Sequence, residues 1–174
     1  MRISRFLLPV AAAAACAVAF AAVHTDYDRH ADFGRYRTYS WLGVRAGDSL
    51  WQDRISGAVD SQLAAKGWTR VASGGDVSVS AFGRVNERDT LQTFYDGYPG
   101  WGWRGWGGIG TTTTQVIPEA VGNVTIDLFD SATKKLIWRG AASETLSPKP
   151  DKNDKKLEHA VAEMFDHFPP KGRD

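Results

Sequence analysis

Apolar residues recur at helical spacing in two stretches of the chain. In the first stretch they are Ile55, Val59 and Leu63, with Ala58 beside them. Positions three and four apart share one face of an α-helix, so this spacing predicts a helix over residues 49–66. Ser49 and Gln52 form a capping-box pair at its start, and Gly67 suits the left-handed position that ends a helix.

The second stretch lies near the C-terminus. Its apolar positions are Leu157, Val161, Met164, Phe165 and Phe168. Pro169-Pro170 follows and cannot continue a helix. A second helix is therefore predicted over about residues 154–168.

Between and before these helices, β-branched and aromatic residues alternate with polar ones, which is typical of half-buried strands. The predicted strands cover residues 38–42, 77–85, 111–117, 124–129 and 136–139. Pro118 is expected to end the third of them. The last two flank the polar turn 130–135 and form an antiparallel hairpin. On this interpretation Asp127 and Asp130 are outward strand and turn residues.

This order of elements is strand, helix, several strands, helix. It predicts an α+β fold: a single two-layer domain over residues 26–170, in which an antiparallel sheet packs with two helices. Neither an internal repeat nor a linker indicates a second domain.

The N-terminus differs in composition from this domain. Arg2 and Arg5 precede an apolar, alanine-rich run over residues 6–22. A basic head and a short apolar stretch predict a signal peptide over residues 1–21, and therefore export. Ala19-Phe20-Ala21 fits an ordinary signal peptidase site.

A second cleavage site is also present. Ala13-Ala14-Ala15-Cys16 resembles a lipobox, with Ala13 in place of the usual leucine. Cys16 is the single cysteine of the chain, so it has no disulfide partner within it. It is the predicted lipidation site of a periplasmic protein. Ala17, in place of aspartate, favours anchoring at the outer membrane.

Composition points to one unusual segment. The chain has 18 Gly and 7 Trp, and many of them fall in a Trp/Gly-rich loop at 94–110. The candidate contact residues there are Tyr98, Trp101, Trp103, Arg104 and Trp106. Exposed aromatic side chains of this kind stack on sugars, settle at a membrane surface or anchor protein contacts. The alternative is that the loop folds back over the domain and shields its own rings.

Charge and motifs bear on the remaining function classes. The net charge of +1 gives no electrostatic reason to expect nucleic acid as a partner. Known catalytic motifs are absent from the sequence, and we expect no catalytic residues, cofactor or metal. Two acidic or histidine-containing groups were considered as metal ligands and interpreted as loop and solvated helix residues: Asp26, Asp28 and Asp32, and His159, Glu163 and His167.

Three segments resemble the bacterial domain of unknown function 4136 family. They are the opening motif over residues 27–41, the segment from Arg54-Ile55 through Gly67-Trp68 to Asp76-Val77, and the hairpin pair Ile126–Asp130 with Leu136–Gly140. The resemblance covers about residues 26–168. It implies a small α+β domain of a Gram-negative envelope lipoprotein, and it assigns no catalytic residues.

These observations favour an exported envelope protein that acts as a non-enzymatic interaction or structural module. Its expected partner is an envelope protein, a glycan or the membrane surface. The alternative is a hydrolase that acts on cell-wall material.

Overall fold

The computed structural model describes residues 22–96 and 111–170. Six strands form one sheet in the order β1-β6-β5-β4-β2-β3. Their bounds are β1 Ala22–Tyr27, β2 Thr38–Arg45, β3 Thr69–Arg70, β4 Val77–Asp96, β5 Thr111–Asp130 and β6 Leu136–Thr145. The two α-helices are α1 Ser49–Ala65 and α2 Pro150–Phe165, and a 3-10 turn, η1, covers Phe33–Arg35.

The α+β class is confirmed, but the expectation of an antiparallel sheet is wrong. The strands β1, β6, β5 and β4 are mutually antiparallel, whereas β2 runs parallel to both β4 and β3. The chain leaves β2 into α1, and α1 returns it to the end of the sheet where β2 began. The next strands must therefore run parallel to β2, because a helical crossover joins parallel neighbours. The sheet is mixed.

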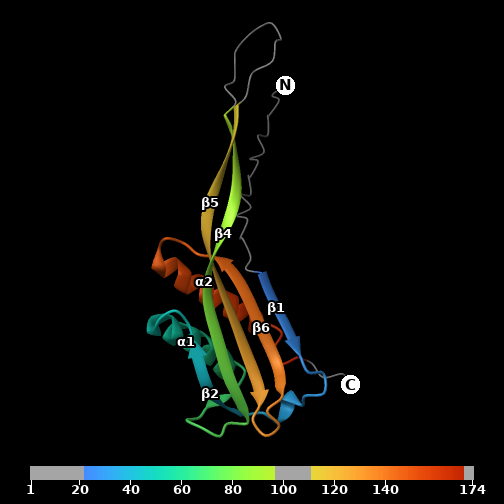
Figure 1. Ribbon diagram of the computed structural model, residues 1–174. Helices are drawn as coiled ribbons and strands as arrows, with labels where there is room; N and C mark the ends of the chain where they lie inside the picture. The colour runs from blue at the N-terminus through green and yellow to red at the C-terminus, as the bar shows by residue number, and fades with distance from the viewer. Residues whose placement is uncertain (1–21, 97–110, 171–174) are drawn as a thin grey trace, which may run out of the picture.

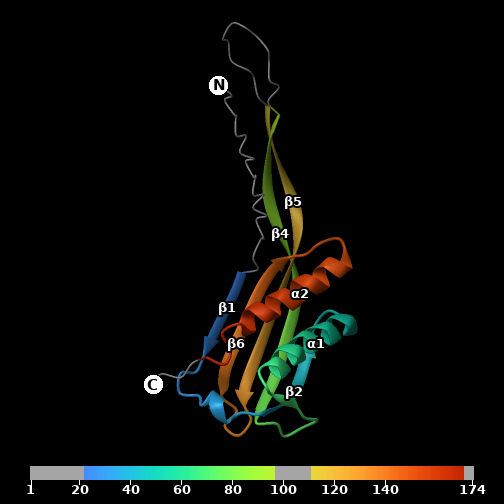
Figure 2. The same cartoon turned by 180° about the vertical axis from the view of Figure 1, so that it is seen from behind.

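Both α-helices of the described residues lie on the same face of the sheet, and within residues 22–96 and 111–170 the opposite face carries no helix (Figures 1 and 2). The core fills the space between the two layers. It includes the predicted apolar positions of both helices, and Val59, Leu63, Val161 and Phe165 are wholly buried. An apolar stripe on each helix thus packs on the inward side chains of the strands.

Helix ends depart from the predicted ones for local reasons. Asp48, not Ser49, caps α1, because its side chain accepts a hydrogen bond from the amide of Trp51 at 2.9 Å. Helix α2 starts four residues earlier than predicted, with Pro150 in its first turn, a position that tolerates proline. Phe168 is buried beyond the helix end.

The strands also differ from the predicted ones. Pro118 does not end β5, which continues in register past it to Asp130. At Pro118 the strand has no neighbour on its other side, so the missing amide proton breaks no ladder bond. Strand β1 was not predicted; it pairs with β6 from Ala22 opposite Ser143 to Tyr27 opposite Trp138.

One end of the core is a cluster of aromatic rings, which we call the aromatic cluster: Phe33, Tyr36, Trp68, Trp138, Phe165 and Phe168. Their ring centroids lie 4.8–6.2 Å apart, mostly edge to face. Such packing adds to the free energy of burial. The cluster joins η1 and the residue after it, the α1–β3 connection, β6 and the end of α2.

Over the described part of the chain, none of the helices is both long and apolar enough to cross a membrane.

Candidate functional site

The most heavily bonded carboxylate of the structure is Asp130, at the end of β5. It is 3% exposed. It accepts hydrogen bonds from the Tyr36 hydroxyl at 2.8 Å, the Thr133 amide at 2.7 Å and the Thr133 hydroxyl at 3.0 Å. It also pairs with the Arg35 guanidinium. The sequence interpretation of Asp130 as an outward turn residue is therefore wrong.

These partners hold the pKa of Asp130 well below its ordinary value. The Thr133 amide has the largest effect, followed by the Tyr36 hydroxyl, because both donate to the charged form of the carboxylate. Asp130 thus joins η1, which carries part of the opening motif, to the β5–β6 turn. Asp130 therefore has a structural role, because its neighbours Arg35, Tyr36 and Thr133 all donate hydrogen bonds to it.

Two further carboxylates perform the same task for β2. Asp76 accepts from the amides of Arg37 and Thr38, both at 2.9 Å, and these bonds lower its pKa. Asp60 on α1 accepts from the Tyr39 hydroxyl at 2.7 Å. The indole of Trp41 donates to the same oxygen at 2.8 Å. Burial, more than this bond, raises the pKa of Tyr39. Asp76 and Asp60 therefore hold β2 in place.

Asp127 also differs from its sequence interpretation. It points to the helix-free face of the sheet but is only 3% exposed, because the Arg139 side chain lies over it. The Arg139 guanidinium donates to both carboxylate oxygens, at 2.5 and 2.7 Å. A two-point arginine–carboxylate pair across neighbouring strands is a stabilising cross-strand contact.

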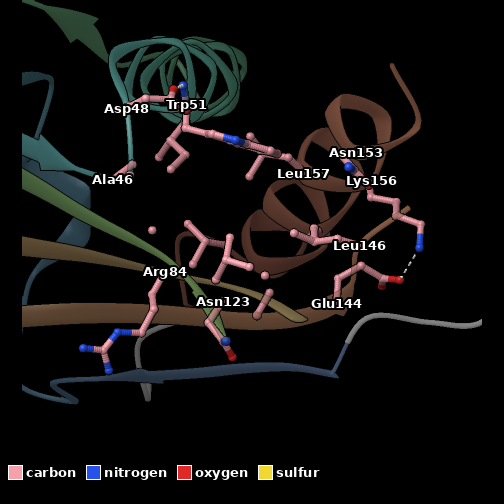
Figure 3. A pocket seen from close by; sticks show the side chains of 18 residues that line it. Ala46, Asp48, Trp51, Arg84, Asn123, Glu144, Leu146, Asn153, Lys156 and Leu157 are labelled. Atoms are coloured by element: carbon pink, nitrogen blue, oxygen red, sulfur yellow. Dashed lines mark hydrogen bonds and ion pairs between the residues drawn. The ribbon is translucent and has the colours of Figure 1, made fainter. Parts of the chain in front are cut away.

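A cavity of about 460 Å³ lies on the helical side, between the starts of α1 and α2 and the sheet. We call it the apolar cavity. Its apolar lining consists of Ala46, Trp51, Ile55, Val85, Val124, Ala142, Leu146, Leu157 and Ala160 (Figure 3). The size falls in the range of small-molecule sites, which are mostly apolar and concave.

The sheet forms the floor of this cavity at two glycines. A Cβ at Gly83 would lie 2.8 Å from Cδ1 of Ile55, and a Cβ at Gly122 would lie 2.9 Å from Cδ2 of Leu146. Ile55 and Leu146 pack directly on the sheet because these two positions have no side chain. In the sequence, an isolated glycine inside a strand indicates such a close approach.

A second feature is a two-stranded arm, formed by residues 87–96 of β4 and 111–120 of β5. The two strands pair without interruption from Val77 opposite Asp130 to Asp96 opposite Thr111. Pairing with β2 stops at Phe82, and pairing with β6 stops at Val121. The arm therefore projects beyond the sheet as a ribbon of two strands (Figures 1 and 2).

The described side chains of the arm expose apolar surface. Leu91 is 69% exposed and Val116, directly opposite it, is 59% exposed. An isolated ribbon of two strands is only marginally stable in water. The exposed pair Leu91 and Val116 is not buried against the rest of the domain, so it adds little to the stability of the ribbon. The arm thus presents an apolar pair to solvent, away from the core.

The predicted contact residues fall outside the described residues: Tyr98, Trp101, Trp103, Arg104 and Trp106. The predicted lipidation site, Cys16, also falls outside them. What the structure does place is the pair of strand ends, Asp96 and Thr111, between which the segment 97–110 is inserted.

The side chains considered as metal ligands do not converge. His159 and Glu163 approach to 3.9 Å, while His167 lies beside Asp166. Asp28 accepts from the amide of His30 at 2.8 Å, and Asp32 accepts from the amide of Gly34. Within residues 22–96 and 111–170, three such side chains are nowhere close enough together to hold a metal ion.

A family model described as a domain of unknown function, DUF4136, matches residues 23–170. The chain belongs to this family. The match confirms the resemblance seen in the opening motif and the hairpin, and it adds β1 to the family domain. None of the curated proteins matches this DUF4136 chain.

Solved structures resemble the DUF4136 domain at low identity. A PDZ domain protein from Parabacteroides distasonis is 14% identical over 87% of this chain, with a TM-score of 0.59. The match covers 36% of that protein, so this chain spans about a third of its length. A PelC dodecamer from Paraburkholderia phytofirmans is 13% identical over 89% of this chain and 100% of its own, with a TM-score of 0.48. The first likeness shows a shared fold, and neither carries over a function.

Proposed function

We propose that this DUF4136 protein is an exported, non-enzymatic interaction module of the bacterial envelope, which meets its partner through the arm. The observation that carries the proposal is the arm itself. Ten residue pairs continue past the sheet with no third strand, and their end holds the Trp/Gly-rich segment. A fold that needed β4 and β5 only for its core would end them at the edge of the sheet.

The use of the titratable groups supports a non-enzymatic role. Asp60, Asp76, Asp127 and Asp130 are all bonded to side chains or amides that hold β2, η1, β6 and the β5–β6 turn in place. A hydrolase requires an acid and a base that face a common substrate position. Among the described residues, no specific observation favours the alternative of a cell-wall hydrolase.

The place where the chain enters the fold bears on the anchor. Ala22 pairs with Ser143, which pairs with Asn123, which pairs with Arg84. Strand β1 thus begins on the row of the sheet from which the arm departs. A lipid on Cys16 would be six residues from Ala22, a reach of at most about 20 Å. The arm extends about 40 Å beyond the same row, at about 3.3 Å for each strand residue.

In a domain anchored through Cys16, the base of the arm would therefore lie near the membrane. A tether of about 20 Å is shorter than the arm, so the arm must lie along the bilayer or reach its surface. Among the three partner classes, this geometry favours the membrane surface or a protein within it. The proposed location is the periplasmic face of the outer membrane.

Replacing Cys16 with serine is expected to move the protein from the membrane fraction to the soluble periplasmic fraction. The reason is that several acyl chains on one residue anchor a protein stably, and serine receives none of them. Fractionation followed by mass spectrometry of the N-terminal peptide is the measurement. Unchanged fractionation and an unmodified cysteine would exclude the anchor.

Replacing Trp101, Trp103 and Trp106 together with alanine is expected to change the melting temperature by less than about 2 °C while weakening partner capture at least fivefold. Because the segment that holds these residues is inserted between the strand ends Asp96 and Thr111, we expect little effect on stability, whereas tryptophans at contact surfaces contribute strongly to binding. Capture is measured in intact cells with a photocrosslinking residue at Leu91.

The matched control places the same crosslinking residue at Leu50 on α1, which is 64% exposed against 69% for Leu91. The proposal is supported if the crosslinker at position 91 forms adducts that are lost in the triple variant and do not form at position 50. The mass of the adducts identifies the partner as lipid, glycan or protein. Equal adducts at both positions, or a large loss of melting temperature in the triple variant, would contradict it.

A further inference from the structure

The apolar cavity lies on the helical side of the domain and goes beyond the function proposed for the arm. We propose that it binds the hydrocarbon chain of a zwitterionic single-chain lipid of the lysophosphatidylethanolamine class, with the head group at the Lys156–Glu144 pair. Three features carry this inference: the composition of the cavity wall, the state of the polar groups around it and the charges at its edge.

Most of the wall is hydrocarbon or aromatic. Trp51 and Ile55 come from α1, and Leu157 and Ala160 come from α2. The sheet and the β2–α1 and β6–α2 connections supply the remaining apolar side chains. Burying a methylene group against such a wall contributes about 0.8 kcal/mol. A flexible chain of methylene groups therefore gains most from this space.

The polar side chains near the wall are already engaged. Asn153 accepts from the amide of Ser147 at 2.7 Å and donates to the carbonyl of Ser147 at 2.8 Å. Asp48 is the cap of α1. Arg84 and Asn123 belong to the helix-free face and point away from the cavity (Figure 3).

Because these polar side chains are already hydrogen-bonded or point away, the cavity favours an apolar ligand. A sugar or a peptide placed here would lose its hydrogen bonds to water and find few replacements, which costs several kcal/mol for each buried polar group. A hydrocarbon chain has no such groups. The occupant of the cavity is therefore apolar along the buried part of its length.

The edge of the cavity carries one positive and one negative side chain. The Lys156 ammonium donates to Oε1 of Glu144 at 2.9 Å (Figure 3). It also donates to the carbonyl of Thr145 at 2.7 Å. Their side chains are 36% and 18% exposed, so the pair lies where the cavity meets solvent.

Each partner of this pair has bonding capacity to spare. An ammonium has three donors, and Lys156 uses two of them, while Oε2 of Glu144 remains an acceptor. A phosphate beside Lys156 and an ammonium beside Glu144 would satisfy both. This is the charge arrangement of a phosphoethanolamine head group, whereas a purely anionic head group would meet the Glu144 carboxylate.

The test is calorimetric titration of the purified full chain with myristoyl lysophosphatidylethanolamine below its critical micelle concentration. We expect saturable binding of one lipid per chain. Gly122→Leu places a side chain on the cavity floor and is expected to weaken binding at least tenfold. Gly57→Leu is the matched control, because a Cβ at Gly57 meets nothing within 4 Å and Gly57 does not line this cavity.

A second pair of variants tests the edge without touching the floor. Lys156→Glu is expected to weaken binding of the same lipid about tenfold, while Lys155→Glu, on the neighbouring exposed residue, leaves it unchanged. If Gly122→Leu melts at a much lower temperature than the parent, the Lys156 and Lys155 variants still test whether the lipid binds at this cavity. Absence of saturable binding to the parent chain, or equal affinities within each pair of folded variants, would overturn the proposal. Neither result depends on the anchor or on capture by the arm.

Discussion

Replacing Trp138 with alanine is expected to lower the free energy of unfolding by about 4 kcal/mol. The side chain is 2% exposed, and its ring lies 4.8 Å from that of Phe165 and 5.5 Å from that of Phe168. It also covers Gly140, where an added Cβ would lie 2.4 Å from the indole. Removing the ring opens a cavity in the aromatic cluster that the strands and α2 cannot close.

Urea unfolding followed by circular dichroism measures this loss. Leu136→Ala on the same strand is the control, because Leu136 is 39% exposed and outside the cluster, and we expect it to cost less than about 1 kcal/mol. Similar losses in the two variants would show that the cluster does not contribute more than ordinary apolar contacts.

Replacing Asp130 with asparagine is expected to cost about 2–4 kcal/mol. The carboxylate accepts from the Thr133 amide, the Thr133 hydroxyl and the Tyr36 hydroxyl, and it pairs with Arg35. Asparagine keeps the shape but removes the charge and turns one acceptor into a donor that faces other donors. Asp166→Asn is the control, because the Asp166 side chain is 74% exposed.

The same carboxylate predicts how stability depends on pH. Its bonds in the folded protein keep the pKa of Asp130 below the value of about 4 for an unfolded chain. Its contribution is therefore fully present above about pH 4 and is lost as the pH falls through the lower, folded-state pKa. Unfolding measured at pH 7 and pH 3 should show a smaller pH effect in Asp130→Asn than in the parent, and an equal effect would contradict this assignment.

The features predicted correctly from sequence are those that depend on neighbours along the chain. The stripe of Ile55, Val59 and Leu63 is buried as predicted, because residues three and four apart share a helix face wherever the helix packs. The hairpin of β5 and β6 was also predicted, since alternation and a polar turn are local signals.

The candidate site was harder to predict than the fold. The arm was missed because Pro118 and the polar residues 86–90 interrupt the apolar pattern, and two strands can pair without a buried face where each supplies the other's hydrogen bonds. The apolar cavity was missed because its wall combines α1, α2, β4, β5 and β6. Gly83 and Gly122 look alike in the sequence, and only their position under Ile55 and Leu146 gives them a role.

The amino-acid sequence by itself determined the α+β class, the two helices, much of the core and the family. These follow from periodicity and from motifs that are complete within short segments. Only the tertiary structure decided that β2 is parallel to β4, that Asp127 and Asp130 are buried partners of Arg139 and Arg35, and that β4 and β5 continue past the sheet. The physical reason is that strand direction, burial of a charge and the space between layers are set by residues that are far apart in the chain and meet only after folding.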